Sequence, residues 1–165
     1  MSGLIRNLLT LLQALLASRP GDLRPKVITH FRVMPWDSGT SVLKSDKYLQ
    51  FVEAAQLDYL VRTTLFATLL RGGLRFVNAS QLVKFMRPIG IFRRVRIETS
   101  IVHADEKCAY FSHSLFLGNL QHAEVLVKMK FKKGSITVPP GDLIAQSFGE
   151  KPEHIATWDR ALEAM

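Results

Sequence analysis

Residues 31–60, FRVMPWDSGTSVLKSDKYLQFVEAAQLDYL, decide the fold of this chain. An alternating run typical of a strand ends at Pro35, and an acid-containing loop, WDSGTSVLK, follows at 36–44. Ser45 then opens a long apolar helix. The first turn of a helix carries backbone N–H groups without intrahelical partners, so this junction brings hydrogen-bond donors close to the Asp37 carboxylate. Such an arrangement suits the polarisation of a carbonyl group.

The surrounding elements follow from the spacing of apolar residues. Residues 26–34 alternate as a strand does, whereas 46–70 carry apolar residues at helical spacing until Gly72 and Gly73 stop the helix. Four further strands are predicted at 74–86, 92–103, 107–117 and 121–132. The turns between the last three fall at 104–106 and 118–119, and short helices are expected at 142–148 and 152–163.

This order of elements predicts an α+β protein. One long apolar helix needs a broad surface to cover it, and a curved antiparallel sheet wrapped around the helix provides that surface. We expect a single domain at 21–141, preceded by an amphipathic helix at 1–20 and followed by a helical extension at 142–165. The sequence contains no internal repeat and no low-complexity linker.

The N-terminal segment has its own pattern. Leucines and Ile5 form one face, while Arg6, Asn7, Thr10 and Gln13 recur on the other. The apolar stretch ends at 18–20, short of the roughly 20 residues that a membrane-spanning helix needs. A soluble or interfacial helix and a cleaved signal peptide both fit this pattern, and we favour the helix. Peripheral contact between residues 1–18 and a membrane surface is a further expectation.

Composition limits the class of protein. The chain has 165 residues, of which 47% are hydrophobic and 22% charged, as in a folded globular protein. The net charge of +8 indicates an anionic partner, which could be a phosphate-bearing ligand, nucleic acid or an acidic membrane surface. The single cysteine, Cys108, excludes an internal disulfide and provides no metal-binding cluster. We expect a cytoplasmic protein, with the inner membrane surface as a peripheral location.

The basic residues are concentrated in one stretch. Residues 71–96 contain seven cations and no acid. The seven are Arg71, Arg75, Lys84, Arg87, Arg93, Arg94 and Arg96. A solvated strand face and a rim that binds anionic groups both explain this cluster.

Several stretches together resemble the thioesterase-like branch of the hot-dog superfamily, related to 4-hydroxybenzoyl-CoA thioesterase. They are FRVMPWD at 31–37, KYLQFVEAAQLDYLVRT at 47–63, FMRPIGIFRRVRIETSIVHADEKCAYF at 85–111 and ITVPPGDLIA at 136–145. The resemblance covers nearly the whole chain and implies the hot-dog fold. It also implies hydrolysis of acyl-CoA thioesters in a homodimer or a dimer of dimers, with sites between protomers.

The signature of that branch, Asp-x-Asp-x-x-x-His-x-Asn-Asn-x-x-Tyr, is partly present. Tyr48 matches the tyrosine of the signature. Asp37 is the only carboxylate near the positions of its two aspartates and could match either of them. The histidine position falls on Val42, and the paired asparagines fall on Lys44 and Ser45.

The resemblance implies roles for the matched residues. Asp37 would act as nucleophile or general base, and backbone N–H groups at 45–47 would bind the oxyanion. Ser41 or Ser45 would orient water, and Tyr48 would hydrogen-bond within the site. Each also has a structural interpretation, because Asp37 suits a turn, Ser45 a helix N-cap and Tyr48 a core.

The resemblance also directs attention to the phosphates of coenzyme A. Arg87, Arg93 and Arg94 flank the turn at 88–90 and are the candidates for binding these phosphates. No metal and no cofactor are expected beyond the coenzyme A moiety of the substrate.

Three functions remain open at this stage. The leading hypothesis is an acyl-CoA thioesterase acting on a fatty or aromatic acyl group. The alternative is a non-catalytic hot-dog protein that binds acyl-CoA or lipid, which the replaced histidine and asparagines favour. Nucleic-acid binding is the third and weakest hypothesis, and no nucleic-acid partner is expected, because no recognised binding motif accompanies the positive charge.

Overall fold

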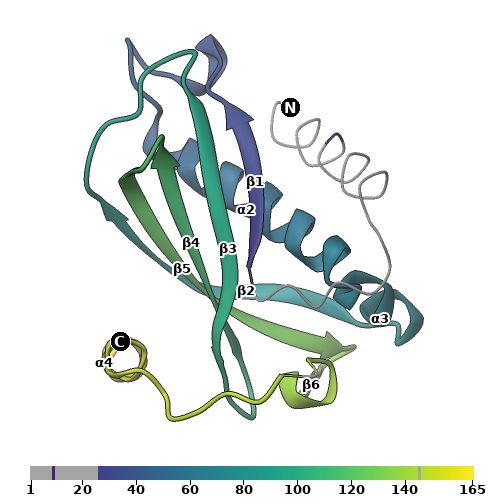
Figure 1. Ribbon diagram of the computed structural model, residues 1–165. Coiled ribbons are helices and arrows are strands. Elements are labelled where there is room, and N and C mark those ends of the chain that lie inside the picture. Colours follow the sequence, from purple (N-terminus) through teal and green to yellow (C-terminus); the bar gives the residue numbers. More distant parts are fainter. Residues whose placement is uncertain (1–8, 10–25, 145) are drawn as a thin grey trace.

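The computed structural model describes residue 9, residues 26–144 and residues 146–165 (Figure 1). The helix predicted at 1–20 and the membrane contact predicted at 1–18 lie, apart from Leu9, outside the described residues. The strands are β1 (Val27–Arg32), β2 (Arg75–Phe85), β3 (Arg94–Ala104), β4 (Ala109–Leu117), β5 (Leu120–Lys133) and β6 (Ile136–Val138). The helices are α2 (Ser45–Arg62), α3 (Leu65–Arg71) and α4 (Glu153–Glu163).

The described strands form one antiparallel sheet that curls around α2 (Figure 1). Its order is β1-β3-β4-β5-β2, and β6 pairs with the end of β5. β1 and β2 are therefore the two edges, although they come first in the chain. This arrangement confirms the α+β fold predicted from the sequence, a curved sheet around one helix.

The core fills the space between α2 and the sheet. Phe51 of α2 stacks on Phe31 of β1 with ring centroids 5.3 Å apart. Two turns later, Tyr59 meets Phe111 of β4 edge to face at 5.5 Å. The buried residues of α2 are Tyr48, Phe51, Val52, Ala54, Ala55, Gln56, Asp58, Tyr59, Leu60 and Val61. They do not fit one narrow stripe, so only a wrapping sheet can cover them.

The prediction of a single helix at 46–70 is wrong, because two helices occupy this stretch. α2 ends at Arg62, and α3 begins at Leu65 after a break at Thr63 and Thr64. The Thr63 hydroxyl donates to the carbonyl of Tyr59 at 2.7 Å, and Thr64 has a left-handed backbone with φ of 62°. Threonine side chains compete for backbone partners in this way, so two in succession end the helix although the apolar spacing continues.

A second correction concerns residues 142–148, where a short helix is expected. The described part of this segment has only a 3-10 turn at Pro140–Asp142 and is otherwise irregular. Leu143, Ile144 and Phe148 instead pack against the core as a strap. The short strand β6 was also absent from the predicted elements, whereas α4 forms where the second helix is expected.

α4 packs on the face of the sheet opposite to α2. Its Ile155 and Trp158 contact Cys108, Tyr110 and Leu126 in a small second core. Tyr110 points outward because its neighbours Ala109 and Phe111 belong to the main core.

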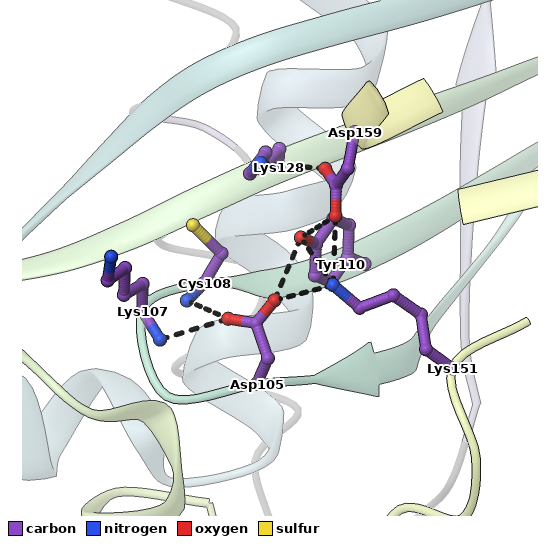
Figure 2. A network of polar contacts seen from close by, with 7 residues as sticks. All are labelled: Asp105, Lys107, Cys108, Tyr110, Lys128, Lys151 and Asp159. Carbon is purple, nitrogen blue, oxygen red and sulfur yellow. Dashed lines mark hydrogen bonds and ion pairs between the residues drawn. The ribbon is translucent and has the colours of Figure 1, made fainter. Parts of the chain in front are cut away.

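A network of charged side chains holds α4 in place (Figure 2). The ammonium group of Lys151 lies 2.8 Å from the Asp105 carboxylate and 2.9 Å from that of Asp159. Lys128 of β5 donates to the other oxygen of Asp159 at 2.7 Å. The Tyr110 hydroxyl sits between the two carboxylates, 3.0 Å from Asp105 and 2.6 Å from Asp159. We call these five residues the α4 latch.

The latch fixes the protonation states of its members. Burial opposes ionisation of Asp105, but hydrogen bonds from Lys151, from the backbone N–H groups of Lys107 and Cys108 and from Tyr110 lower its pKa to about 2. Burial and the two carboxylates both raise the pKa of Tyr110, which stays a neutral phenol. At neutral pH Asp105 is therefore ionised and Tyr110 is neutral.

Replacement of Lys151 should loosen α4. In Lys151→Met, Asp105 and Asp159 lose their common cation while remaining partly buried, and we expect about 1–3 kcal/mol less stability in urea unfolding. Lys107→Met is the matched control, because Lys107 contacts Asp105 through its backbone N–H alone among the described interactions. That variant should change stability by no more than about 0.5 kcal/mol. Equal losses of stability in the two variants would contradict the conclusion that the latch holds α4 in place.

Stability should also depend on pH through Asp105. Its pKa falls from 3.8 to about 2 in the folded protein, so its contribution is present above about pH 4 and disappears as the pH falls towards 2. The stability difference between wild type and Asp105→Asn, on the order of 2 kcal/mol at neutral pH, should therefore shrink below pH 4. Denaturant titrations at several pH values test this, with Glu106→Gln, an exposed neighbour, expected to follow the wild-type curve.

Candidate active site

Asp37 lies in a 3-10 turn at Pro35–Asp37, directly after β1. Pro35 suits the first position of such a turn, because its fixed φ matches the turn and its missing N–H is not needed there. The Asp37 carboxylate accepts the backbone N–H of Met34 at 3.1 Å and is fully buried. A buried carboxylate beside a protein backbone is held in a fixed direction, which a nucleophile or general base requires.

The loop after Asp37 is anchored to a second loop. The N–H of Leu43 donates to the carbonyl of Ile89 at 2.8 Å, and the N–H of Ile91 donates to that of Ser41 at 3.2 Å. The N–H of Lys44 donates to the carbonyl of Asp37 at 3.1 Å. A direct backbone hydrogen bond therefore connects the acid to the start of α2.

The first turn of α2 begins one residue earlier than the N-cap prediction places it. Lys44 is the N-cap, and its side chain makes no capping hydrogen bond in the described part of the chain. Ser45 is the first helical residue and is exposed, so its interpretation as the N-cap is wrong. The N–H of Lys47 donates to the carbonyl of Lys44 at 3.0 Å, so the candidate donors for a ligand in this turn are the N–H groups of Ser45 and Asp46.

Tyr48 lies on the buried side of the same turn. Its ring meets Phe85 of β2 edge to face at 5.0 Å, and 4% of the residue is exposed. Burial raises the pKa of Tyr48 against the effect of a backbone hydrogen bond with Ile89. The phenol is therefore neutral and can donate or accept a hydrogen bond.

The three arginines predicted to bind phosphate are all exposed, at two different places. Arg93 and Arg94 lie beside the end of β1, where the carbonyl of Arg93 accepts the N–H of Val33 at 3.0 Å. Arg87 lies at the other end of the β2–β3 connection, where it donates to the carbonyl of Gln121 at 3.1 Å. The structure thus brings Asp37, Ser45 and Tyr48 to one junction, while Arg93 and Arg94 pair with the end of β1 just before the Asp37 turn.

Sequence reasoning missed a second group of polar residues, which lies inside the core. Thr29 donates to Asp58, which also accepts from Arg62 at 2.7 Å. Thr99 and His113 share a hydrogen bond of 3.0 Å, and burial lowers the pKa of His113 to about 3. The sequence signal for such a pair is a polar residue at a position where the pattern of a helix or strand expects an apolar one. This signal marks each polar residue but does not identify the residue with which it forms a hydrogen bond.

Gln56 and Asn78 form the remaining pair of this kind. The Asn78 amide donates to Gln56 Oε1 at 3.2 Å, and it comes from the edge strand β2. Gln56 Nε2 and Asn78 Oδ1 are buried without a hydrogen-bond partner among the described residues. One donor and one acceptor thus lie unused between α2 and an open sheet edge.

The described residues meet the requirements neither of a metal site nor of a membrane-spanning helix. They contain no group of three or more His, Cys, Asp or Glu side chains that could hold a metal ion. They also contain no helix that is long and apolar enough to cross a membrane.

Comparison with known proteins shows the fold. No family model and no curated protein sequence matches the chain. Among solved structures, it is similar to a probable thioesterase from Escherichia coli, with 18% identity and a TM-score of 0.66 over 70% of this chain and 92% of that one. It is also similar to 4-hydroxybenzoyl CoA thioesterase from Pseudomonas sp. strain CBS-3, with 17% identity and a TM-score of 0.65 over 74% and 99%.

A probable thioesterase from Bartonella henselae gives 21% identity and a TM-score of 0.63 over 69% of this chain and 98% of that one. The chain therefore has the hot-dog fold. The fold that the sequence resemblance implies is confirmed, and the similar structures include the 4-hydroxybenzoyl-CoA thioesterase to which the resemblance refers.

Proposed function

We propose that this protein hydrolyses the thioester of a fatty or aromatic acyl-CoA. The observation that carries the proposal is the buried Asp37 carboxylate at the start of α2, one backbone hydrogen bond away from the helix N-cap. Asp37 would activate water for attack on the thioester carbonyl, or would attack the carbonyl itself to give a mixed anhydride that water then cleaves to the free acid. The N–H groups of Ser45 and Asp46 would stabilise the oxyanion. Coenzyme A would leave as its thiol.

The similar structures support an acyl-CoA substrate. One of them is a mutant 4-hydroxybenzoyl CoA thioesterase solved in complex with 4-hydroxybenzoyl CoA. In this chain Ser45 would orient water, and Tyr48 would hydrogen-bond to the acyl or pantetheine part. Arg93 and Arg94 would meet the phosphates of coenzyme A, with Arg87 as a more distant contact.

A second candidate function is binding without hydrolysis. Val42 and Lys44 occupy the positions of the histidine and of one asparagine in the related signature. Val42 is exposed, and its backbone carbonyl accepts the N–H of Gly39 within the loop. A hot-dog protein with these replacements could hold acyl-CoA or lipid without cleaving it. Membrane contact through residues 1–18 would suit either function.

The exchange Asp37→Asn separates the two functions. The amide keeps the shape and can still accept the Met34 N–H, so the fold should persist while the nucleophile or base is lost. We expect hydrolysis of acyl-CoA to fall on the order of 10²–10⁴-fold. Asp46→Asn, which removes an exposed carboxylate from the first turn of α2, is the matched control and should keep full activity. Hydrolysis at the uncatalysed background rate by both proteins would leave binding without catalysis, whereas equal rates above background would remove Asp37 from the mechanism.

We further propose that the protein is a homodimer formed through β2. This strand is an open edge of the sheet, 11 residues long, and it exposes Val77, Leu82 and Phe85. A long edge strand with apolar side chains is a template for a second strand.

Charges on β2 should dissociate the dimer. Val77→Lys and Leu82→Lys would each place a positive charge on both strands of the proposed interface, and we expect the sedimentation coefficient to fall to that of a monomer. Ile136→Lys, which adds the same charge to the exposed residue of β6, is the control and should leave the assembly unchanged. A dimer that persists in both β2 variants would place the interface elsewhere.

A further inference from the structure

Two loops at one end of the molecule form a rigid platform, which we define as residues 33–43 and 89–93. The end lies beyond the tip of β1, away from α3 and β6 (Figure 1). Besides the two hydrogen bonds at Leu43 and Ile91, the N–H of Phe92 donates to the carbonyl of Val33 at 2.8 Å. The N–H of Val33 in turn donates to the carbonyl of Arg93. Both loops are therefore fixed by backbone pairing.

The platform presents apolar side chains to solvent. Trp36 and Phe92 are each 60% exposed, and Val42 is 41% exposed. Phe92 also has a left-handed backbone with φ of 62°, which is unfavourable for a residue with a side chain. An aromatic residue that is held in this conformation and still faces water contributes little to the core.

Three arginines lie within or directly beside the platform. Arg32 and Arg94 are direct neighbours across the β1–β3 ladder, and Arg93 follows Phe92. None of the three forms an ion pair in the described part of the chain. Two like charges at opposite strand positions weaken a sheet, so this pair has no structural benefit.

The acids at this end do not neutralise the patch. Asp37 is fully buried, and Asp46 lies 3.9 Å from Lys47. The positive field is evident at His30, where burial together with Arg94 and Arg96 lowers the pKa of the ring. The platform thus combines exposed aromatic groups with a positive surface.

We propose that the platform docks the protein on an anionic lipid surface. Tryptophan and phenylalanine suit the boundary between headgroups and acyl chains, while arginine binds headgroup phosphates. A second copy of this chain fits less well, because it would bring the same three arginines against each other. The inference is independent of thioester hydrolysis, although docking would bring the junction at Asp37 close to the lipid.

Tryptophan fluorescence can test which end of the molecule meets the lipid. The chain has two tryptophans, of which Trp158 is 7% exposed and Trp36 is 60% exposed. In the full-length Trp158→Phe variant, Trp36 is the only emitter. With vesicles of phosphatidylcholine and phosphatidylglycerol we expect a blue shift and quenching by brominated lipid. Pure phosphatidylcholine should give a much weaker response, and added salt should reduce binding. Wild type provides the same readout if Trp158→Phe loosens α4.

Two variants separate loss of docking from loss of folding. Phe92→Asn removes an apolar tip and places a residue that tolerates the left-handed backbone, so it should keep or raise thermal stability while weakening vesicle binding about tenfold. Arg32→Gln should weaken binding about fivefold. The matched controls at the other end, Ile136→Asn and Arg71→Gln, should bind as wild type does. Asp37→Asn should also bind as wild type does, so a failure of hydrolysis is distinguishable from a failure of docking.

Three results would overturn the proposal. If the chain binds vesicles while Trp36 stays open to an aqueous quencher, another surface such as residues 1–18 makes the contact. If Phe92→Asn changes the oligomeric state but not vesicle binding, the platform meets a second copy. If free coenzyme A shifts the emission of Trp36 and vesicles do not, the platform serves a soluble nucleotide.

Discussion

Complete burial of the middle of α2 is the constraint on which the rest of the structure depends. Phe51, Ala55 and Leu60 have no exposed surface, and Gln56 and Asp58 are buried with them. A flat layer would cover one side of such a helix, so the sheet has to curl until β1 and β2 stand at opposite edges. The same requirement explains why β3, β4 and β5, which come later in the chain, occupy the centre of the sheet.

The wrapped helix also determines where chemistry can take place. Several polar groups within the core pair with each other, as Thr29 does with Asp58 and Thr99 with His113. The start of α2 is different, because its backbone donors end at a loop and not within the sheet. Pairing between residues 41–43 and 89–91 then holds that loop, so the buried Asp37 carboxylate has a fixed relation to the helix terminus.

The sequence predicts those features that local chemistry controls. Alternation assigns the face of β1, and the pair Gly118 and Asn119 locates the β4–β5 turn, where Gly118 has φ of 58°. The apolar spacing of 46–70 predicts the buried helix but not its break, because Thr63 acts by competing for a backbone carbonyl. At the candidate site, Asp37, Ser45 and Tyr48 are close in sequence, so their proximity in space could be predicted from the sequence alone. The latch contact between Asp105 and Lys151 joins residues 46 positions apart, and no periodicity in the sequence indicates it.

The position of α4 has a consequence for synthesis of the protein. The ribosome delivers all six strands before α4, so the sheet can form while Tyr110, Leu126 and Cys108 still lack their cover. During that interval the nascent chain exposes an apolar patch, and Asp105 and Lys128 have no helix-borne partners. Such a surface is a natural target for a chaperone on the nascent chain, and slow translation of the strap that precedes α4 would prolong the exposure.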